Sequence, residues 1–134
     1  DSDILYSLLC IAFFADEEID ESEKDIIFES YKLFVPELNN EIFNSDFGLA
    51  TSKFIDLKTE ELRKKQFDES LGNVKESLTN DSLTMLVKCY VNIANADDFI
   101  HENEVLLINQ AIKKWDLNFI LEKPKSGKKL ELKD

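Results

Sequence analysis

An acidic corner between two helical segments occurs twice in this sequence, and this repeat constrains the fold more than any other feature. The segment ADEEIDESEKDII, residues 15–27, matches the segment ADDFIHENEVLLI, residues 96–108, at an offset of 81 positions. The matching pairs are Ala15/Ala96, Asp16/Asp97, Ile19/Ile100, Glu21/Glu102, Glu23/Glu104, Ile26/Leu107 and Ile27/Ile108. Agreement at so many places with one spacing indicates an internal duplication.

The residues that flank each corner predict one buried helix and one covering helix per repeat. Residues 4–15 and 83–96 are apolar around most of a helical circumference, which is typical of helices packed on several sides. Residues 21–34 and 102–115 carry apolar side chains at helical spacing on one side only. We therefore expect the first two segments to form the core pair of the fold, with the other two covering them.

The remainder of the chain also favours helices. Three Gly, two Pro and no Asn-Gly or Asp-Gly pair leave little support for hairpins. Residues 37–56 are predicted to be less regular, with Gly48 as a cap or turn. Thr59 is predicted to cap a long helix with five apolar residues on one face: Leu62, Phe67, Leu71, Val74 and Leu78. The sequence thus predicts an all-α helical bundle with an internal pseudo-repeat.

Length and charge limit the domain count and the kind of partner. A chain of 134 residues with 43% hydrophobic content is expected to form one domain, residues 1–122, followed by a basic tail, residues 123–134. A formal charge of −12 argues against nucleic acid and suits a cation or a basic protein surface. No apolar run is long enough to span a membrane. Cys10 and Cys89 lie in apolar runs, which favours reduced, buried thiols and a cytoplasmic location.

The tail KPKSGKKLELKD admits two interpretations. Pro, Gly, Ser and Lys bury little apolar surface, so the first is a solvated end. In the second, the tail folds back on the acidic body, with Leu130 and Leu132 alternating in a short edge strand.

The repeated Ala-Asp-x-x-Ile-x-Glu-x-Glu corner resembles the tellurite-resistance TerB family, which includes the N-terminal domain of the DjlA co-chaperones. The resemblance covers residues 4–33 and 83–115, and Glu17 and Asp98 stand where the family has glycine. It implies an all-α stress-response module without enzymatic activity, whose corners bind a divalent cation. The positions that carry over as metal ligands are Asp16, Glu23, Asp97 and Glu104.

Helix capping is the competing interpretation of the same four residues. A corner aspartate accepts hydrogen bonds from the turn backbone, and a glutamate three residues into a helix is the usual partner in a capping box. A standard EF-hand loop is excluded, because its first ligand position falls on Ala12 in one repeat and on Ile93 in the other. Any ion would therefore be calcium, magnesium, manganese or zinc in a less regular site.

The lone histidine, His101, lies in the second corner. It either joins carboxylates in a transition-metal site or is an exposed loop residue, and we expect the latter. No nucleophile motif, glycine-rich phosphate loop or His-Glu-x-x-His helix occurs, so we expect no enzymatic activity.

Two functions stay open at this point. One is an interaction module whose acidic corners bind a divalent cation or a basic partner surface. The other is a co-chaperone-like or assembly domain that binds a protein through an apolar groove, with structural corners.

Overall fold

The computed structural model confirms the all-α bundle. It describes residues 1–13, 19–96, 101–122 and 130–133. Within these residues the helices are α1 (Ser2–Phe13), α2 (Glu21–Lys32), α3 (Asn40–Asp56), α4 (Glu60–Ser77), α5 (Asn80–Ala94) and α6 (Glu102–Lys114). Two short strands follow, β1 (Ile120–Glu122) and β2 (Glu131–Lys133). No helix in the described part of the chain has the length and apolar character needed to cross a membrane.

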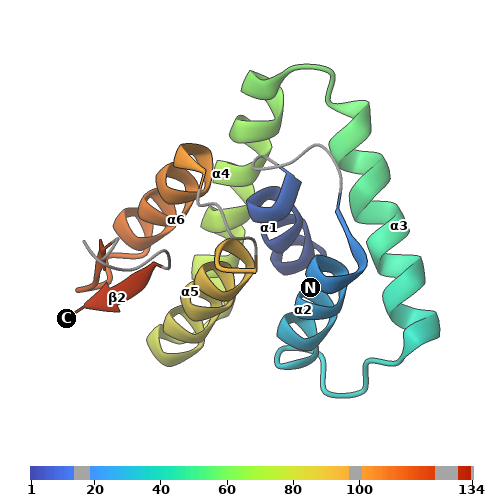
Figure 1. Cartoon of the computed structure of the whole chain (residues 1–134), viewed down its shortest axis with the longest axis horizontal. Helices are drawn as coiled ribbons and strands as arrows, with labels where there is room; N and C mark the ends of the chain where they lie inside the picture. The colour runs from blue at the N-terminus through green and yellow to red at the C-terminus, as the bar shows by residue number, and fades with distance from the viewer. Residues whose placement is uncertain (14–18, 97–100, 123–129, 134) are drawn as a thin grey trace.

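Helix α1 lies in the middle of the bundle and contacts each of the other five helices (Figure 1). Every residue from Ile4 to Ala12 is buried, including the hydroxyl residue Ser7. The Ser7 hydroxyl donates to the Ile4 carbonyl at 2.7 Å and accepts from the Tyr90 hydroxyl at 2.7 Å. The buried polar groups of the α1–α5 contact therefore satisfy one another, as burial requires.

The prediction that the first and fifth helices form the core pair is confirmed. Helices α1 and α5 contact each other, and the largest buried side chains of α5 include Leu83 and Tyr90. The two covering helices are α2, which begins at Glu21, and α6, which begins at Glu102, so their first residues are 81 positions apart, as the repeat requires. Ile27 and Ile108, at matching positions, are both fully buried.

The prediction for residues 37–56 was wrong. Residues 40–56 form the regular helix α3, and Gly48 lies in its interior, not at a cap. Asn39 caps this helix, since its side-chain oxygen accepts from the Ile42 N–H at 2.9 Å. Phe43, Ala50 and Phe54 fall on one buried face, so tertiary packing outweighs the cost of about 1 kcal/mol for an interior glycine.

Thr59 caps α4 as predicted, but the apolar face of that helix is shorter than expected. Phe67, Leu71 and Val74 are buried. Leu62 is exposed and Leu78 is only partly buried, because they lie near the two ends of the helix.

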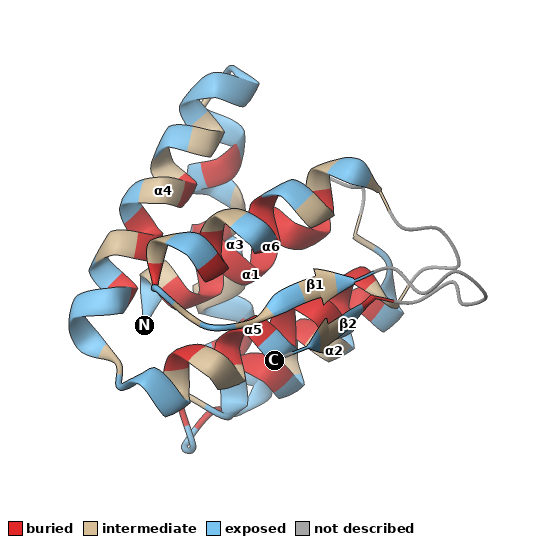
Figure 2. Cartoon of the chain, turned by 90° about the vertical axis from the view of Figure 1, so that its left-hand side faces the viewer, coloured by how far each residue is buried: buried red, intermediate tan, exposed pale blue. Residues whose placement is uncertain are grey.

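At the C-terminal end, residues 130–133 take the second of the two predicted arrangements. Strand β2 pairs antiparallel with β1, a strand that the sequence pattern did not predict, with Leu132 opposite Leu121. The pair lies beside α6 at the edge of the bundle (Figure 2). The Asn95 side chain holds Leu130 by two hydrogen bonds: it donates to the Leu130 carbonyl at 3.1 Å and accepts from its N–H at 2.7 Å. Leu130 is consequently buried.

The central position of α1 and α5 predicts how substitutions that shorten their buried side chains affect stability. Leu9→Ala and Leu86→Ala each remove a fully buried side chain and should lower the free energy of unfolding by about 2 to 5 kcal/mol. Leu106→Ala, at a side chain that is 61% exposed on α6, is the matched control and should have little effect. Urea unfolding followed by circular dichroism measures all three. Equal losses in the core and control variants would contradict the packing described above.

Candidate functional site

The first acidic corner leads into a complete capping box at the start of α2. The Glu23 N–H donates to Asp20 Oδ1 at 2.8 Å, and the Asp20 N–H donates to Glu23 Oε1 at 3.4 Å. The hydrogen bond from the Glu23 N–H, aided by the Ser22 hydroxyl, lowers the pKa of the exposed Asp20 carboxyl. Asp20 thus stays ionised at the positive end of the helix dipole, where a negative charge is favoured.

The second corner repeats this arrangement with a different cap residue. His101 is the N-cap of α6, and its backbone N–H donates to Glu104 Oε1 at 3.1 Å. The His101 side chain is partly buried, so the prediction of an exposed loop histidine was wrong.

Both capping glutamates are buried, which sets them apart from most of the acidic residues around them. Glu23 is 2% exposed and Glu104 is 1% exposed. A buried carboxylate is tolerated only where hydrogen bonds, a positive charge or a metal compensates for lost hydration, and the backbone bonds at the two caps supply part of this. The structure therefore gives Glu23 and Glu104 a capping role.

The other two predicted ligands, Asp16 and Asp97, lie outside the described residues. Among the residues that are described, no three His, Cys, Asp or Glu side chains gather closely enough to hold a metal ion. The candidate ligands that the structure does describe are therefore Glu23 in the first turn of α2 and Glu104 in the first turn of α6.

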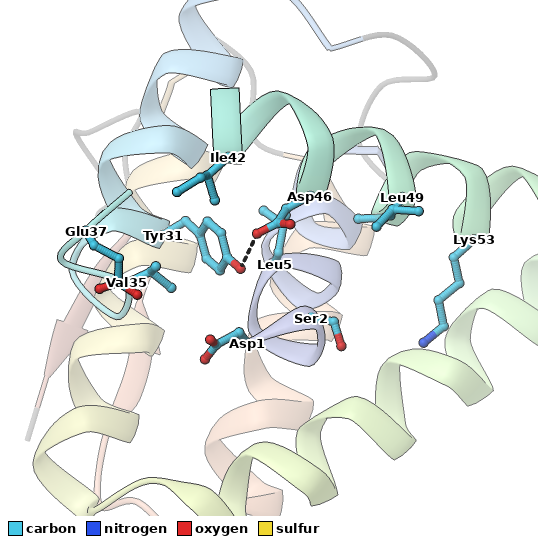
Figure 3. Close-up of a pocket in the computed structure, with 11 residues that line it drawn as sticks. Asp1, Ser2, Leu5, Tyr31, Val35, Glu37, Ile42, Asp46, Leu49 and Lys53 are labelled. Atoms are coloured by element: carbon cyan, nitrogen blue, oxygen red, sulfur yellow. Dashed lines mark hydrogen bonds between the residues drawn. The ribbon is translucent and has the colours of Figure 1, made fainter. Parts of the chain in front are cut away.

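A second candidate site is a groove of about 490 Å³ between the start of α1, the end of α2 and the length of α3 (Figure 3). Eleven residues line it: Asp1, Ser2, Leu5, Tyr31, Val35, Glu37, Ile42, Asp46, Leu49, Ala50 and Lys53. Leu5, Tyr31, Val35 and Ala50 are buried and form an apolar floor. Leu49, on the rim, is 70% exposed, the most exposed large apolar side chain among the described residues.

Tyr31 and Asp46 are the polar side chains of the groove that are joined by a hydrogen bond. The Tyr31 hydroxyl donates to Asp46 Oδ2 at 3.0 Å (Figure 3). Burial raises the pKa of Tyr31, and the negative charges of Asp46 and Glu37 raise it further. The phenol is therefore neutral at physiological pH and holds the Asp46 carboxylate in place as a hydrogen-bond donor.

Helix α3 is held in position by aromatic contacts on its buried face. Phe43 meets Phe28 of α2 edge-on, with ring centroids 5.1 Å apart. Phe54 stacks on Phe13 of α1 at 4.8 Å, and Arg63 Nε donates to the carbonyls of Phe54 and Leu57 at 2.9 and 2.8 Å. These contacts fix α3 at both ends, so the wall of the groove is preformed.

The sequence interpretation missed this groove because it treated residues 37–56 as irregular. A usable signal was present: Ile42, Asp46, Leu49 and Lys53 are spaced i, i+4, i+7 and i+11, which places them on one helical face. Asn39 before them is a standard N-cap residue. Nothing in the sequence shows that this face would lie opposite Tyr31 and Val35.

The groove has the character of a binding surface. Its tyrosine hydroxyl is held in the neutral form. An apolar floor with a few convergent polar groups is typical of a site that binds a ligand or a protein segment.

Comparisons with protein-family models, curated proteins and solved structures find no match to this chain.

The two capping glutamates generate a stability prediction. Glu104→Ala leaves the His101 N–H without its carboxylate acceptor and should lower the free energy of unfolding by about 1 to 3 kcal/mol. Glu104→Gln keeps an amide oxygen at the same place and should lose less. Glu102→Ala, at an exposed position in the same first turn, is the control. Thermal or urea unfolding distinguishes these cases, and an equal loss in the Gln and Ala variants would show that the carboxylate charge, not the cap, is what matters.

Proposed function

We propose that this chain is a non-enzymatic protein-interaction module of the TerB-like kind, and that it binds a segment of a partner protein in the groove between α1, α2 and α3. The observation that carries this proposal is the combination of a buried apolar floor with the exposed rim residues Ile42 and Leu49. Exposed apolar side chains beside a preformed groove are characteristic of protein-interaction sites.

The charge of the groove supports a partner segment with a basic residue next to its apolar face. Glu37 lies at one end of the groove and Asp46 lies beside Tyr31 (Figure 3), and the negative charges of both carboxylates raise the pKa of Tyr31. The chain as a whole carries a formal charge of −12, which attracts basic partners and repels nucleic acid.

The likeness to the TerB family rests on the sequence of the corners and on two features consistent with it. The chain is an all-α bundle, and its covering helices start 81 residues apart, each with a buried glutamate at its third position. The proposal extends the family's association with stress responses, and a cytoplasmic location, to this protein.

A divalent cation at the acidic corners is the second candidate function. It is favoured by the burial of Glu23 and Glu104 at equivalent positions in the two repeats, since a bound cation is one means of compensating a buried carboxylate. The remaining ligands in this proposal are Asp16 and Asp97, with calcium, magnesium, manganese or zinc as the ion.

The groove proposal predicts the behaviour of peptides selected against this protein. Random peptides are displayed on phage and selected for binding to the wild-type protein. The selected peptides should bind the Leu106→Asp variant as well as the wild type and the Leu49→Asp variant at least about tenfold more weakly. The reason is that a buried leucine contact contributes about 1.5 to 3 kcal/mol. Leu106 is a fair control because it is 61% exposed on α6. Fluorescence anisotropy with the individual peptides measures the affinities. Failure to enrich peptides, or enrichment of peptides indifferent to Leu49→Asp, would contradict the proposal.

The cation candidate predicts ion-dependent stability. Millimolar calcium, magnesium, manganese or zinc should raise the melting temperature of the wild type by mass action, because an ion that binds only the folded state stabilises it. The Asp16→Asn, Asp97→Asn double variant should keep its fold and lose this increase, since the amides cannot supply the ligand charge. Differential scanning calorimetry with and without each ion is the measurement. If no ion raises the wild type above the double variant, the corners do not bind cations.

A further inference from the structure

The groove in Figure 3 has opposite charges at its two ends. Glu37, after the end of α2, lies at one end, and Lys53, in the last turn of α3, lies at the other (Figure 3). Asp46 and Leu49 lie between them along α3 (Figure 3). A segment that crosses the groove along α3 therefore passes Glu37 and Ile42 first, then Asp46, then Leu49 and last Lys53.

The part of α3 that lines the groove, from Ile42 to Lys53, is about three turns long. Ile42, Asp46, Leu49 and Lys53 follow one face of α3, and a separation of eleven residues at 1.5 Å per residue spans roughly 16 Å. The groove is walled by helices and presents side chains, so a partner helix can pack its own ridges between those of α3 and the end of α2. An added β-strand would instead need unpaired backbone groups of a sheet edge.

The charged groups at the two ends have capacity for a partner. Neither Glu37 nor Lys53 takes part in any of the salt bridges found among the described residues. The Lys53 ammonium lies 5.2 Å from the centroid of the Tyr6 ring, a contact that leaves it open to a carboxylate. Asp46 receives the Tyr31 hydroxyl on one oxygen, and a carboxylate can accept further hydrogen bonds.

We propose that the groove recognises an amphipathic helix and binds it in a single orientation. This helix has a Lys or Arg at one end, an Asp or Glu about eleven residues away on the same face, and two apolar residues between them. This inference rests on the proposed function of the groove and adds the chemistry of the partner. The basic end lies by Glu37, the acidic end lies by Lys53, and the apolar pair covers Ile42 and Leu49, on either side of Asp46. A helix that is basic at both ends is disfavoured, because Lys53 repels its second charge.

A synthetic peptide tests the orientation directly. The probe is a 16-residue helical peptide with Lys, Leu, Leu and Glu at positions i, i+4, i+7 and i+11, and a nitroxide spin label next to its Glu. In amide NMR spectra of the wild type, the label should broaden the signals around Lys53 more strongly than those around Ile42. Fluorescence anisotropy should show binding about fivefold weaker when the peptide's Glu is replaced by Lys, as expected when one exposed ion pair becomes a repulsion.

A charge-exchanged protein provides the matched control. The triple variant Glu37→Lys, Asp46→Asn, Lys53→Glu exchanges the charges of the two ends, and the asparagine keeps an oxygen that can accept from the Tyr31 hydroxyl. Glu37 and Lys53 are exposed, so we expect the fold to persist. The same peptide should then bind in the opposite orientation, and the broadening should move to the signals around Ile42.

The outcomes separate this inference from the function on which it rests. Equal broadening at both ends, or a broadening pattern that does not move in the triple variant, overturns the single orientation. If Leu49→Asp still weakens the peptide at least tenfold in that case, the groove remains a protein-binding site. Binding that is indifferent to Leu49→Asp overturns both proposals. Self-association of the protein through the groove, detected by sedimentation and abolished by Leu49→Asp, would replace the partner helix with a second copy of the chain.

Discussion

The burial of α1 on all sides is the constraint on which the rest of the structure depends. Nine consecutive residues, Ile4 to Ala12, are removed from water by contacts with five other helices. At about 25 cal/mol per Å² of apolar surface, each neighbouring helix stabilises α1 in proportion to the apolar area that it covers. Ser7, a polar side chain within this run, is tolerated because Tyr90 donates to it and it donates to the Ile4 carbonyl. Because α1 must be covered, α2, α3, α4, α5 and α6 are arranged around it.

Helix α3 connects this core to the proposed binding site. Its buried face, Phe43, Ala50 and Phe54, completes the cover of α1 and α2. Its adjacent face, with Ile42 and Leu49, extends beyond that cover and forms the rim of the groove. The same helix thus contributes to stability and to binding. A rigid wall of this kind reduces the entropic cost of ordering a binding surface.

The two corners show how one residue pattern supports two physical roles. Glu23 and Glu104 cap helices and are also almost completely buried. Capping by itself operates at exposed helix ends, so burial is an additional feature shared by the repeats. Asp20 and His101, which occupy the same position in the two repeats, show that the cap tolerates a change of side chain while the glutamate is retained.

The sequence by itself determined the helical class, the two repeats, the buried pair α1 and α5, the cap at Thr59 and the capping glutamates Glu23 and Glu104. These features depend on local spacing and on side-chain hydrogen bonds within a few residues. Only the tertiary structure decided the course of residues 40–56, the pairing of β1 with β2 and the groove itself. Gly48 and the weak amphipathicity of α3 are local signals against a helix, and they are overcome by contacts of Phe43 and Phe54 with distant residues. The groove joins Tyr31 to Asp46 and places Lys53 at the far end, an arrangement that follows from how α2 and α3 pack and not from the spacing within either helix.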